Sequence, residues 1–218
     1  MALGLSRLHF PITTLGPGRR VGIWVQGCSI QCPGCISADT WRAADVRLEV
    51  GEIVSRIGPW LDECDGVTVS GGEPFDQPEG LQELLTAIHR QWNTNVLVYT
   101  GHPVEHIEHN LKAMAPMIDA LVSDPFEINQ PQTKALRGSD NQRLHCLTER
   151  GLALFSQYER ALTAEDRQLH VMMDAQGTAW LAGIPARGDL ARLQAILHAQ
   201  GHTSFTSEAP TTPCHKPP

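Results

Sequence analysis

The chain has 218 residues, of which 41% are hydrophobic and 19% charged, a composition typical of a globular protein with one substantial core. The formal net charge is −7 and lysine and arginine form no dense run, so we expect no nucleic-acid partner. No apolar stretch approaches the length of a membrane span, and residues 1–10 lack the apolar core of a signal peptide. We therefore also expect no membrane association.

The six cysteines divide into a group of three and three scattered residues, Cys64, Cys146 and Cys214. This distribution does not match the disulfide framework of a small secreted domain, so we expect a reducing, cytoplasmic environment. Cys64 and Cys146 are interpreted as small core residues, and Cys214 as a residue of a flexible tail.

Strands and helices alternate along the first two thirds of the chain. Short β-rich runs predict strands at 21–26, 66–69, 95–99 and 117–122. Apolar residues at helical spacing predict helices at 50–61, 78–92 and 103–114, and a further helix is expected to begin near Asn141. This alternation favours an α/β fold with a mainly parallel sheet, in which loops at the carboxyl ends of the strands carry the site.

The pattern changes from about Arg167. Strands at 169–173 and 178–182 flank a predicted hairpin turn at 174–177, and Asp189 is expected to cap a helix that ends at Gly201. A last short strand is predicted at 202–206, before a proline-rich tail. We expect a core domain at 1–165, a small α+β extension at 166–207 and a flexible tail at 208–218.

Cys28, Cys32 and Cys35 form a CxxxCxxC loop directly after the first predicted strand. Three thiolates so close in sequence can bind three irons of a [4Fe–4S] cluster, and no nearby cysteine supplies a ligand for the fourth iron. That iron is then open to a small molecule, which favours chemistry over electron storage. A structural zinc site needs four ligands and is less favoured, and a disulfide is less favoured still.

The segment Gly71-Gly72-Glu73-Pro74 follows the second predicted strand. Two glycines allow the backbone to approach a ligand closely, and the Glu73 carboxylate can accept a hydrogen bond from an ammonium group. Alone, the segment is equally compatible with an ordinary strand-to-helix turn.

These two motifs, in this order, resemble the radical S-adenosylmethionine superfamily. The resemblance implies that Cys28, Cys32 and Cys35 ligate a catalytic [4Fe–4S] cluster whose open iron binds S-adenosylmethionine. It also implies that Gly71, Gly72 and Glu73, with Pro74, bind the methionyl end of that cofactor. In this family, reductive cleavage of S-adenosylmethionine yields a 5′-deoxyadenosyl radical, which abstracts a hydrogen atom. The fold implied is a partial (β/α)6 TIM-like barrel, followed here by the α+β extension.

Further segments are similar to the activating enzymes of glycyl-radical proteins, and most of all to the activase of anaerobic ribonucleotide reductase. They are 16–20, 25–28, 32–35, 40–41, 124–126 and 137–143. The resemblance implies an oxidoreductase of anaerobic metabolism that removes hydrogen from a glycine of a partner glycyl-radical enzyme. An external electron donor such as flavodoxin is also implied.

Other residues at strand ends are candidates for binding the cofactor. Thr100, Gly101, Ser123 and Asp124 follow the third and fourth predicted strands, although Asp124 is equally suited to cap the next turn. Arg137 is a candidate partner for the cofactor carboxylate, with an ordinary surface arginine as the alternative. Asn141 is a candidate ligand contact or a helix N-cap.

Two observations favour a different substrate. Ile36 and Ser37 stand where family members usually have an aromatic residue or histidine and then asparagine, and the extension lies beyond the short activase. The alternative function is therefore a radical enzyme that modifies a small molecule or peptide in a biosynthetic pathway. A non-enzymatic iron–sulfur electron carrier or metal-binding interaction module is a third hypothesis, but it does not need the Gly71–Glu73 motif.

Overall fold

The computed structural model describes residues 1–173 and 178–208, which form one large sheet, a two-stranded hairpin and five α-helices. The seven strands of the large sheet have the order β3-β1-β2-β4-β5-β6-β7. Their bounds are β1 Ala2–Ile12, β2 Arg20–Val25, β3 Arg47–Glu49, β4 Gly66–Gly71, β5 Asn95–Tyr99, β6 Ala120–Ser123 and β7 Arg143–Cys146. Strands β2, β4, β5 and β6 are parallel to one another, as predicted.

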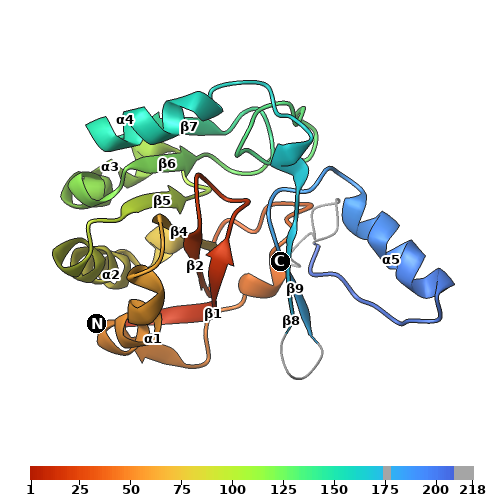
Figure 1. Ribbon diagram of the computed structural model, residues 1–218, viewed down its shortest axis with the longest axis horizontal. Coiled ribbons are helices and arrows are strands. Elements are labelled where there is room, and N and C mark those ends of the chain that lie inside the picture. Colours follow the sequence, from red (N-terminus) through yellow and green to blue (C-terminus); the bar gives the residue numbers. More distant parts are fainter. Residues whose placement is uncertain (174–177, 209–218) are drawn as a thin grey trace, which may run out of the picture.

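Three helices cover one face of this sheet (Figure 1). They are α1 Val50–Leu61, α2 Pro78–Gln91 and α3 Val104–Met114. Each buries one apolar stripe, for example Leu81, Leu84 and Leu85 of α2, against the buried valines of the central strands. The helix periodicity of the sequence therefore located these helices to within a residue or two of each end.

The edges of the sheet differ from the prediction. Strands β1 and β3, which the sequence analysis did not anticipate, extend the sheet in the antiparallel sense beyond β2. The helix expected near Asn141 is wrong, because residues 143–146 form β7, which pairs antiparallel with β6. No sheet closes among the described residues, so the expected barrel is not confirmed.

Strand β7 forms because its side chains alternate. Leu144 and Cys146 pack against the apolar cluster around Leu97, Val122 and Phe155. The next helix, α4 Glu149–Phe155, starts after Thr148, whose hydroxyl accepts a hydrogen bond from the Gly151 N–H at 2.9 Å. The sequence pattern at 143–146 is thus that of a strand, with a period of two, and the helix begins at the capping residue that follows it.

Two buried charged side chains tie the parallel strands together. Arg20 is fully buried and donates to Thr68 Oγ1 at 2.7 Å, to Asn95 Oδ1 at 2.8 Å and to the Val67 carbonyl at 2.6 Å. These bonds join β2, β4 and β5 near the ends at which the strands begin. A buried guanidinium is tolerated here because its donors find acceptors.

Asp119, the second of these buried charged side chains, directly precedes β6. Its carboxylate accepts hydrogen bonds from the Val96 N–H, from Thr148 Oγ1 and from the guanidinium of Arg150. Burial alone raises the pKa of this carboxyl, but the hydrogen bonds from Arg150, Thr148 and Val96 hold the pKa below its ordinary value. The ionised carboxylate therefore fixes α4 to the edge of the sheet.

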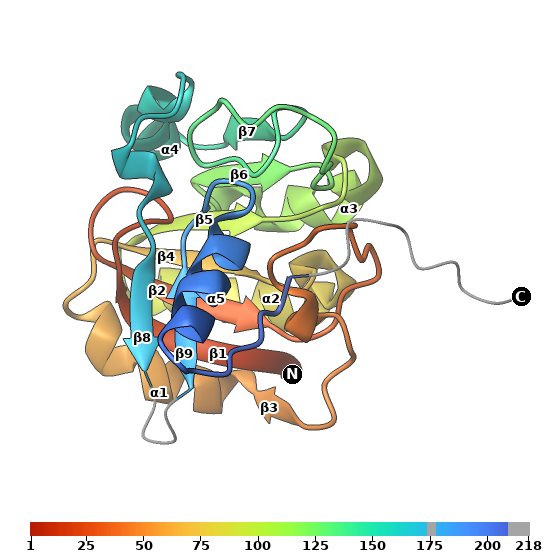
Figure 2. The same ribbon diagram turned by 90° about the vertical axis from the view of Figure 1, so that its right-hand side faces the viewer.

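The C-terminal extension lies on the side of the sheet opposite to α1, α2 and α3 (Figures 1 and 2). It contains the antiparallel hairpin β8 His170–Met173 and β9 Ala179–Ala182, and helix α5 Asp189–Ala199. The predicted hairpin is confirmed, although its turn at 174–177 lies outside the described residues. Asp189 is the first residue of α5 and not its N-cap, which is Gly188, and the described residues 202–206 form no strand.

The extension packs on the sheet through a small apolar cluster. Met172 and Ala182 of the hairpin contact Ile12, Leu15 and Trp24. In α5 only Leu190 is buried. The extension is therefore attached to the sheet by far fewer buried side chains than the helices on the other face.

Candidate functional site

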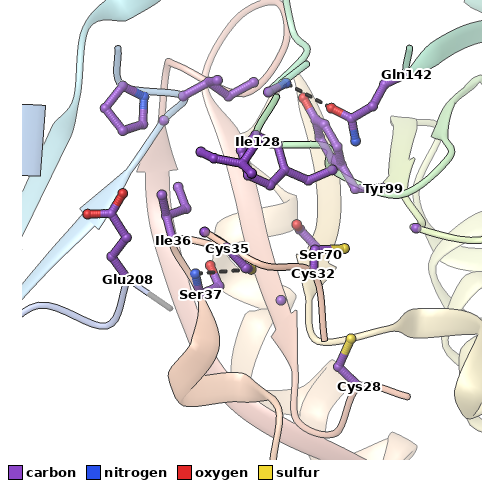
Figure 3. A pocket seen from close by; sticks show the side chains of 18 of the residues that line it. Cys28, Cys32, Cys35, Ile36, Ser37, Ser70, Tyr99, Ile128, Gln142 and Glu208 are labelled. Carbon is purple, nitrogen blue, oxygen red and sulfur yellow. Dashed lines mark hydrogen bonds between the residues drawn. The ribbon is translucent and has the colours of Figure 1, made fainter. Parts of the chain in front are cut away.

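The carboxyl ends of the parallel strands meet at one pocket of about 220 Å³. The residues that line it include Cys28, Cys32 and Cys35 after β2, Gly71, Gly72 and Glu73 at the end of β4, and Thr100 and Gly101 after β5. Figure 3 shows the three cysteines around this space. The structure thus brings together eight of the residues that the sequence nominated, all from loops at one edge of the sheet.

The two glycines are required by the way the loops pack. Gly71 has a φ of +105°, and a Cβ at Gly72 would lie 2.0 Å from the Gly27 carbonyl oxygen. The Gly72 N–H bonds the Val25 carbonyl at 2.9 Å, and the Glu73 N–H bonds the Gly27 carbonyl at 2.8 Å. These bonds fix the loop after β4 against the start of the cysteine loop. A side chain at Gly72 would prevent this close approach of the two backbones.

Glu73 is buried and already accepts three hydrogen bonds. One oxygen accepts from the Phe75 N–H at 2.9 Å and from Thr100 Oγ1 at 2.7 Å, and the other accepts from the Gly101 N–H at 2.8 Å. Burial raises the pKa of Glu73, and these hydrogen bonds oppose that effect. A carboxylate has about four acceptor positions, so roughly one remains for a ligand such as an ammonium group.

The cysteine loop is compact and its thiols are partly buried. The Cys35 N–H bonds the Cys32 carbonyl at 3.1 Å, and the Ser37 N–H donates to Cys35 Sγ at 3.4 Å. Burial raises the pKa of all three thiols, that of Cys32 to about 11. Because a thiol binds metal as the thiolate, loading this site with metal releases protons.

The arrangement of the three thiols fits an iron–sulfur cluster. They line one pocket, whereas Cys64 and Cys146 do not and Cys214 lies outside the described residues. In the described part of the chain, no three His, Cys, Asp or Glu side chains converge on a position for a single metal ion. A cluster needs no such convergence, because each thiolate binds a different iron.

The other nominated residues lie away from the lining of the pocket. Pro74 is buried beside Glu73. Ser123 and Asp124 bond each other, and Arg143 holds the Asp124 carboxylate at 2.7 Å. Asp124 has a φ of +80°; burial alone raises the pKa of its carboxyl, but the Arg143 guanidinium keeps that pKa below its ordinary value.

Arg137 and Asn141 belong to the loop before β7. Arg137 is buried rather than on the surface, and its guanidinium bonds Glu159. Asn141 donates from Nδ2 to the Pro125 carbonyl at 2.8 Å, and it caps no helix. Their adjacent residues Gly138 and Gln142 line the pocket, so this loop forms part of its wall.

Sequence reasoning missed a large part of the lining. Ile30, Ile36, Phe126 and Ile128 make one side of the pocket apolar, and residues 181–188 and Leu190 of the extension and Glu208 of the tail also line it. Phe126 was noted only within the segment 124–126 that is similar to the activases, and Ile36 only as a departure from the family pattern; Ile30 and Ile128 carry no signal that distinguishes them from core residues. The hairpin and helix of the extension were predicted, but no local pattern showed that the extension lines the pocket.

Comparisons with known proteins agree with this geometry. A family model described as a 4Fe-4S single cluster domain matches residues 14–145. The chain is 31% identical over 142 residues to the anaerobic ribonucleoside-triphosphate reductase-activating protein of Enterobacteria phage T4, which covers 62% of this chain and 88% of that relative. The chain belongs to the radical S-adenosylmethionine activases that carry a single [4Fe–4S] cluster domain.

Two further relatives show the breadth of this activase family. The reductase-activating protein of Vibrio cholerae is 30% identical over 151 residues, with 64% of this chain and 96% of that relative covered. The pyruvate formate-lyase-activating enzyme of Streptococcus mutans is 31% identical over 140 residues, with 59% of this chain and 52% of that enzyme covered. The cofactors expected from the sequence, a [4Fe–4S] cluster and S-adenosylmethionine, are those of the family, and that expectation is confirmed. No helix in the described residues is long and apolar enough to cross a membrane.

Proposed function

We propose that this activase removes a hydrogen atom from a glycine of a partner glycyl-radical enzyme of the anaerobic ribonucleotide reductase type. The observation that carries the proposal is the single pocket shared by the three cysteines and the Gly71–Glu73 loop. The names of the relatives support this choice of partner. Cys28, Cys32 and Cys35 would hold the [4Fe–4S] cluster, which would supply the reducing chemistry for cleavage of S-adenosylmethionine and for hydrogen abstraction.

In this proposal each loop has a separate task. Cys28, Cys32 and Cys35 hold the cluster, and the free acceptor position of Glu73 orients the ammonium group of S-adenosylmethionine. Thr100 and Gly101 keep the Glu73 carboxylate in place. Apolar side chains such as Ile30, Phe126 and Ile128 exclude water, which protects a reactive radical. The roles of Pro74, Ser123, Asp124, Arg137 and Asn141 as cofactor contacts are also part of the proposal.

The proposal also covers the fold, the domain limits, the cellular location and the electron donor. The proposal includes a partial barrel, because an open side of the sheet would admit a polypeptide segment. We also retain domain limits at 1–165, 166–207 and 208–218, a cytoplasmic location and an external donor such as flavodoxin. The sheet with its helices on one face supports the first of these.

One experiment tests the activity. The reconstituted protein is reduced anaerobically with S-adenosylmethionine and with a glycyl-radical enzyme encoded in the same genome. We expect 5′-deoxyadenosine, and a glycyl doublet by electron paramagnetic resonance on the partner. Formation of 5′-deoxyadenosine without the doublet, for every such partner, contradicts the activase role and leaves the family chemistry intact.

A second candidate is a radical enzyme that acts on a small molecule or short peptide. The observation that favours it is the C-terminal extension, which lines one side of the pocket and so narrows the access for a protein segment. At about 220 Å³ the pocket is smaller than the roughly 300 to 1,000 Å³ of typical small-ligand pockets, so it needs to widen for either class of substrate, and less for a small molecule. Hydrogen transfer from a small molecule, and from no protein, would favour this candidate.

A further inference from the structure

The extension and the first residue of the tail form one side of the pocket, which we call the C-terminal wall. It consists of residues 181–188, Leu190 and Glu208, which line the pocket, together with Ser207, which precedes Glu208. The family model ends at residue 145, before the wall begins. The phage relative is matched over 88% of its own length but over only 62% of this chain. The wall therefore lies outside the part of this chain that the family model matches.

Hydrogen bonds hold the wall against both sides of the site. Gln132 donates to the Pro185 carbonyl at 2.9 Å, and Arg187 donates to the Glu127 and Gln130 carbonyls. On the other side, Ser207 Oγ donates to the Ile36 carbonyl at 2.7 Å. The Ala38 N–H also donates to the Ser207 carbonyl, at 3.0 Å. The wall thus has a defined position and its contacts include the residues that follow Cys35.

The attachment by Ser207 coincides with the departure of this chain from the family pattern. Ile36 and Ser37 replace the usual aromatic residue or histidine and asparagine, and the segment at 207–208 lies beside them (Figure 3). The wall therefore occupies the side of the pocket on which this chain differs from other activases. That placement suits an element that selects the substrate.

Glu208 is the charged group of the wall that makes no hydrogen bond or ion pair with any other residue in the ranges 1–173 and 178–208. Its side chain is half-buried and lines the pocket. Arg187, the cation of the wall, is engaged by backbone carbonyls and lies over Phe126. Glu73, the other carboxylate of the pocket, is bonded by Thr100 and Gly101. A half-buried carboxylate without a partner is stabilised by a cation that arrives with a ligand.

We propose that the C-terminal wall selects the polypeptide substrate, and that Glu208 binds a lysine or arginine side chain close to the glycine that loses hydrogen. This inference rests on the proposed function, since it concerns the partner segment that enters the same pocket. Glu208 is a specificity-determining residue here and takes no part in the hydrogen transfer.

The test uses short glycine-containing peptides and the reconstituted holoprotein with S-adenosylmethionine, under anaerobic conditions. Two matched series place either lysine or norleucine at successive positions beside the glycine. Affinity is measured by fluorescence anisotropy without reductant, so that binding is recorded without turnover. We expect at least one lysine peptide to bind about tenfold more tightly than its norleucine counterpart, a preference that weakens as salt is raised.

Three variants make the test specific. Glu208→Gln should abolish the lysine preference and leave the norleucine affinities unchanged, whereas Glu208→Lys should shift the preference to glutamate peptides. Glu63→Gln removes the same charge from an exposed site at the end of α1 and should change nothing. With reductant, Glu208→Gln should raise KM for the lysine peptide and leave kcat unchanged.

Three results would overturn the inference. They are an absence of lysine preference at every position, a preference that survives Glu208→Gln, and a loss of S-adenosylmethionine affinity in Glu208→Gln without peptide. The last result would assign Glu208 to the cofactor. Failure of the activase function itself has a different signature, because then no partner protein gains a glycyl doublet whatever the charge of the peptide bound.

Discussion

The parallel core and the C-terminal extension differ in how much of their surface they bury. In α2, Leu81, Leu84, Leu85 and Ile88 are almost fully buried. In α5, which is nearly as long, Leu190 is the only buried residue. Both regions line the same pocket, so the site combines a rigid side that carries the chemistry with a more loosely attached side.

The residues on the two sides of the pocket are held in position to different degrees. The cysteine loop and the Gly71–Glu73 loop are fixed by close backbone contacts and by hydrogen bonds to Glu73. The wall is fixed by a few hydrogen bonds to exposed or half-buried groups. Elements that bury few apolar side chains open at lower free energy than the core, so the wall can adjust to a substrate while the core stays folded.

The largest effect should come from the cluster ligands. Cys35→Ser removes one thiolate from the pocket, and we expect iron and sulfide bound after anaerobic reconstitution to fall to background. Cys146→Ser is the matched control, because Cys146 packs beside Leu144 away from the pocket and should leave iron content unchanged. A full cluster in Cys35→Ser would mean that another residue supplies the third ligand.

The next largest effect should come from the glycine contact that fixes the core side. In Gly72→Ala the new methyl group collides with the Gly27 carbonyl, and we expect a loss of about 3 kcal/mol in the free energy of unfolding. Gly51→Ala is the control, since its methyl group meets no atom within 4 Å. Urea denaturation of both variants measures the difference. Equal stability of the two would show that the loops can separate without cost.

The Asp119 bonds should give a pH-dependent effect of intermediate size. We expect Asp119→Asn to cost about 2 kcal/mol at pH 7, because Arg150 loses its charged acceptor. The folded-state pKa of Asp119 lies below its ordinary value. The stabilisation is therefore fully present above the unfolded-state pKa of about 4, and is lost as pH falls through the folded-state pKa.

Urea titrations of the wild type and Asp119→Asn at pH 7, 4 and 3 measure this dependence. The difference in the free energy of unfolding between the two proteins should be smaller at pH 3 than at pH 7. Asp45→Asn, at an exposed carboxylate, should stay within about 0.5 kcal/mol of wild type throughout. If the difference in the free energy of unfolding does not change with pH, the charge of the Asp119 carboxylate is not what stabilises the fold.

The smallest effect on global stability should come from the extension. We expect Leu190→Ala to speed amide hydrogen exchange in α5 and to shift the free energy of unfolding of the core by less than about 0.5 kcal/mol. Leu84→Ala, a matched change in α2, should cost about 2–5 kcal/mol. Similar losses in the two variants would contradict the difference between core and extension.

The sequence predicted elements in both the core and the extension. The parallel strands and α1 to α3 were located from the sequence because each is a regular apolar pattern that packs on its neighbours. Three cysteines and the Gly71–Glu73 motif were nominated from their spacing within single loops, and the structure places both at one pocket. The hairpin β8–β9 was recognised from two β-rich runs.

The remaining features depend on contacts between distant parts of the chain. Strand β1 pairs with β2 and β3 at the edge of the sheet, a choice that no local pattern dictates. The period-two pattern of β7 covers only four residues, so its pairing with β6 is what decides that this stretch is a strand. Glu208 is far from the cysteines in sequence, and only tertiary structure places both at one pocket.

The hydrogen bonds to Glu73 have a thermodynamic consequence. Phe75, Thr100 and Gly101 immobilise the carboxylate during folding, so the loops around it have little freedom left to lose when a ligand arrives. Binding at such a preordered acceptor carries a small conformational-entropy penalty. A Thr100→Val variant should therefore weaken the methionyl contact through entropy, a change that calorimetry separates from loss of a direct bond.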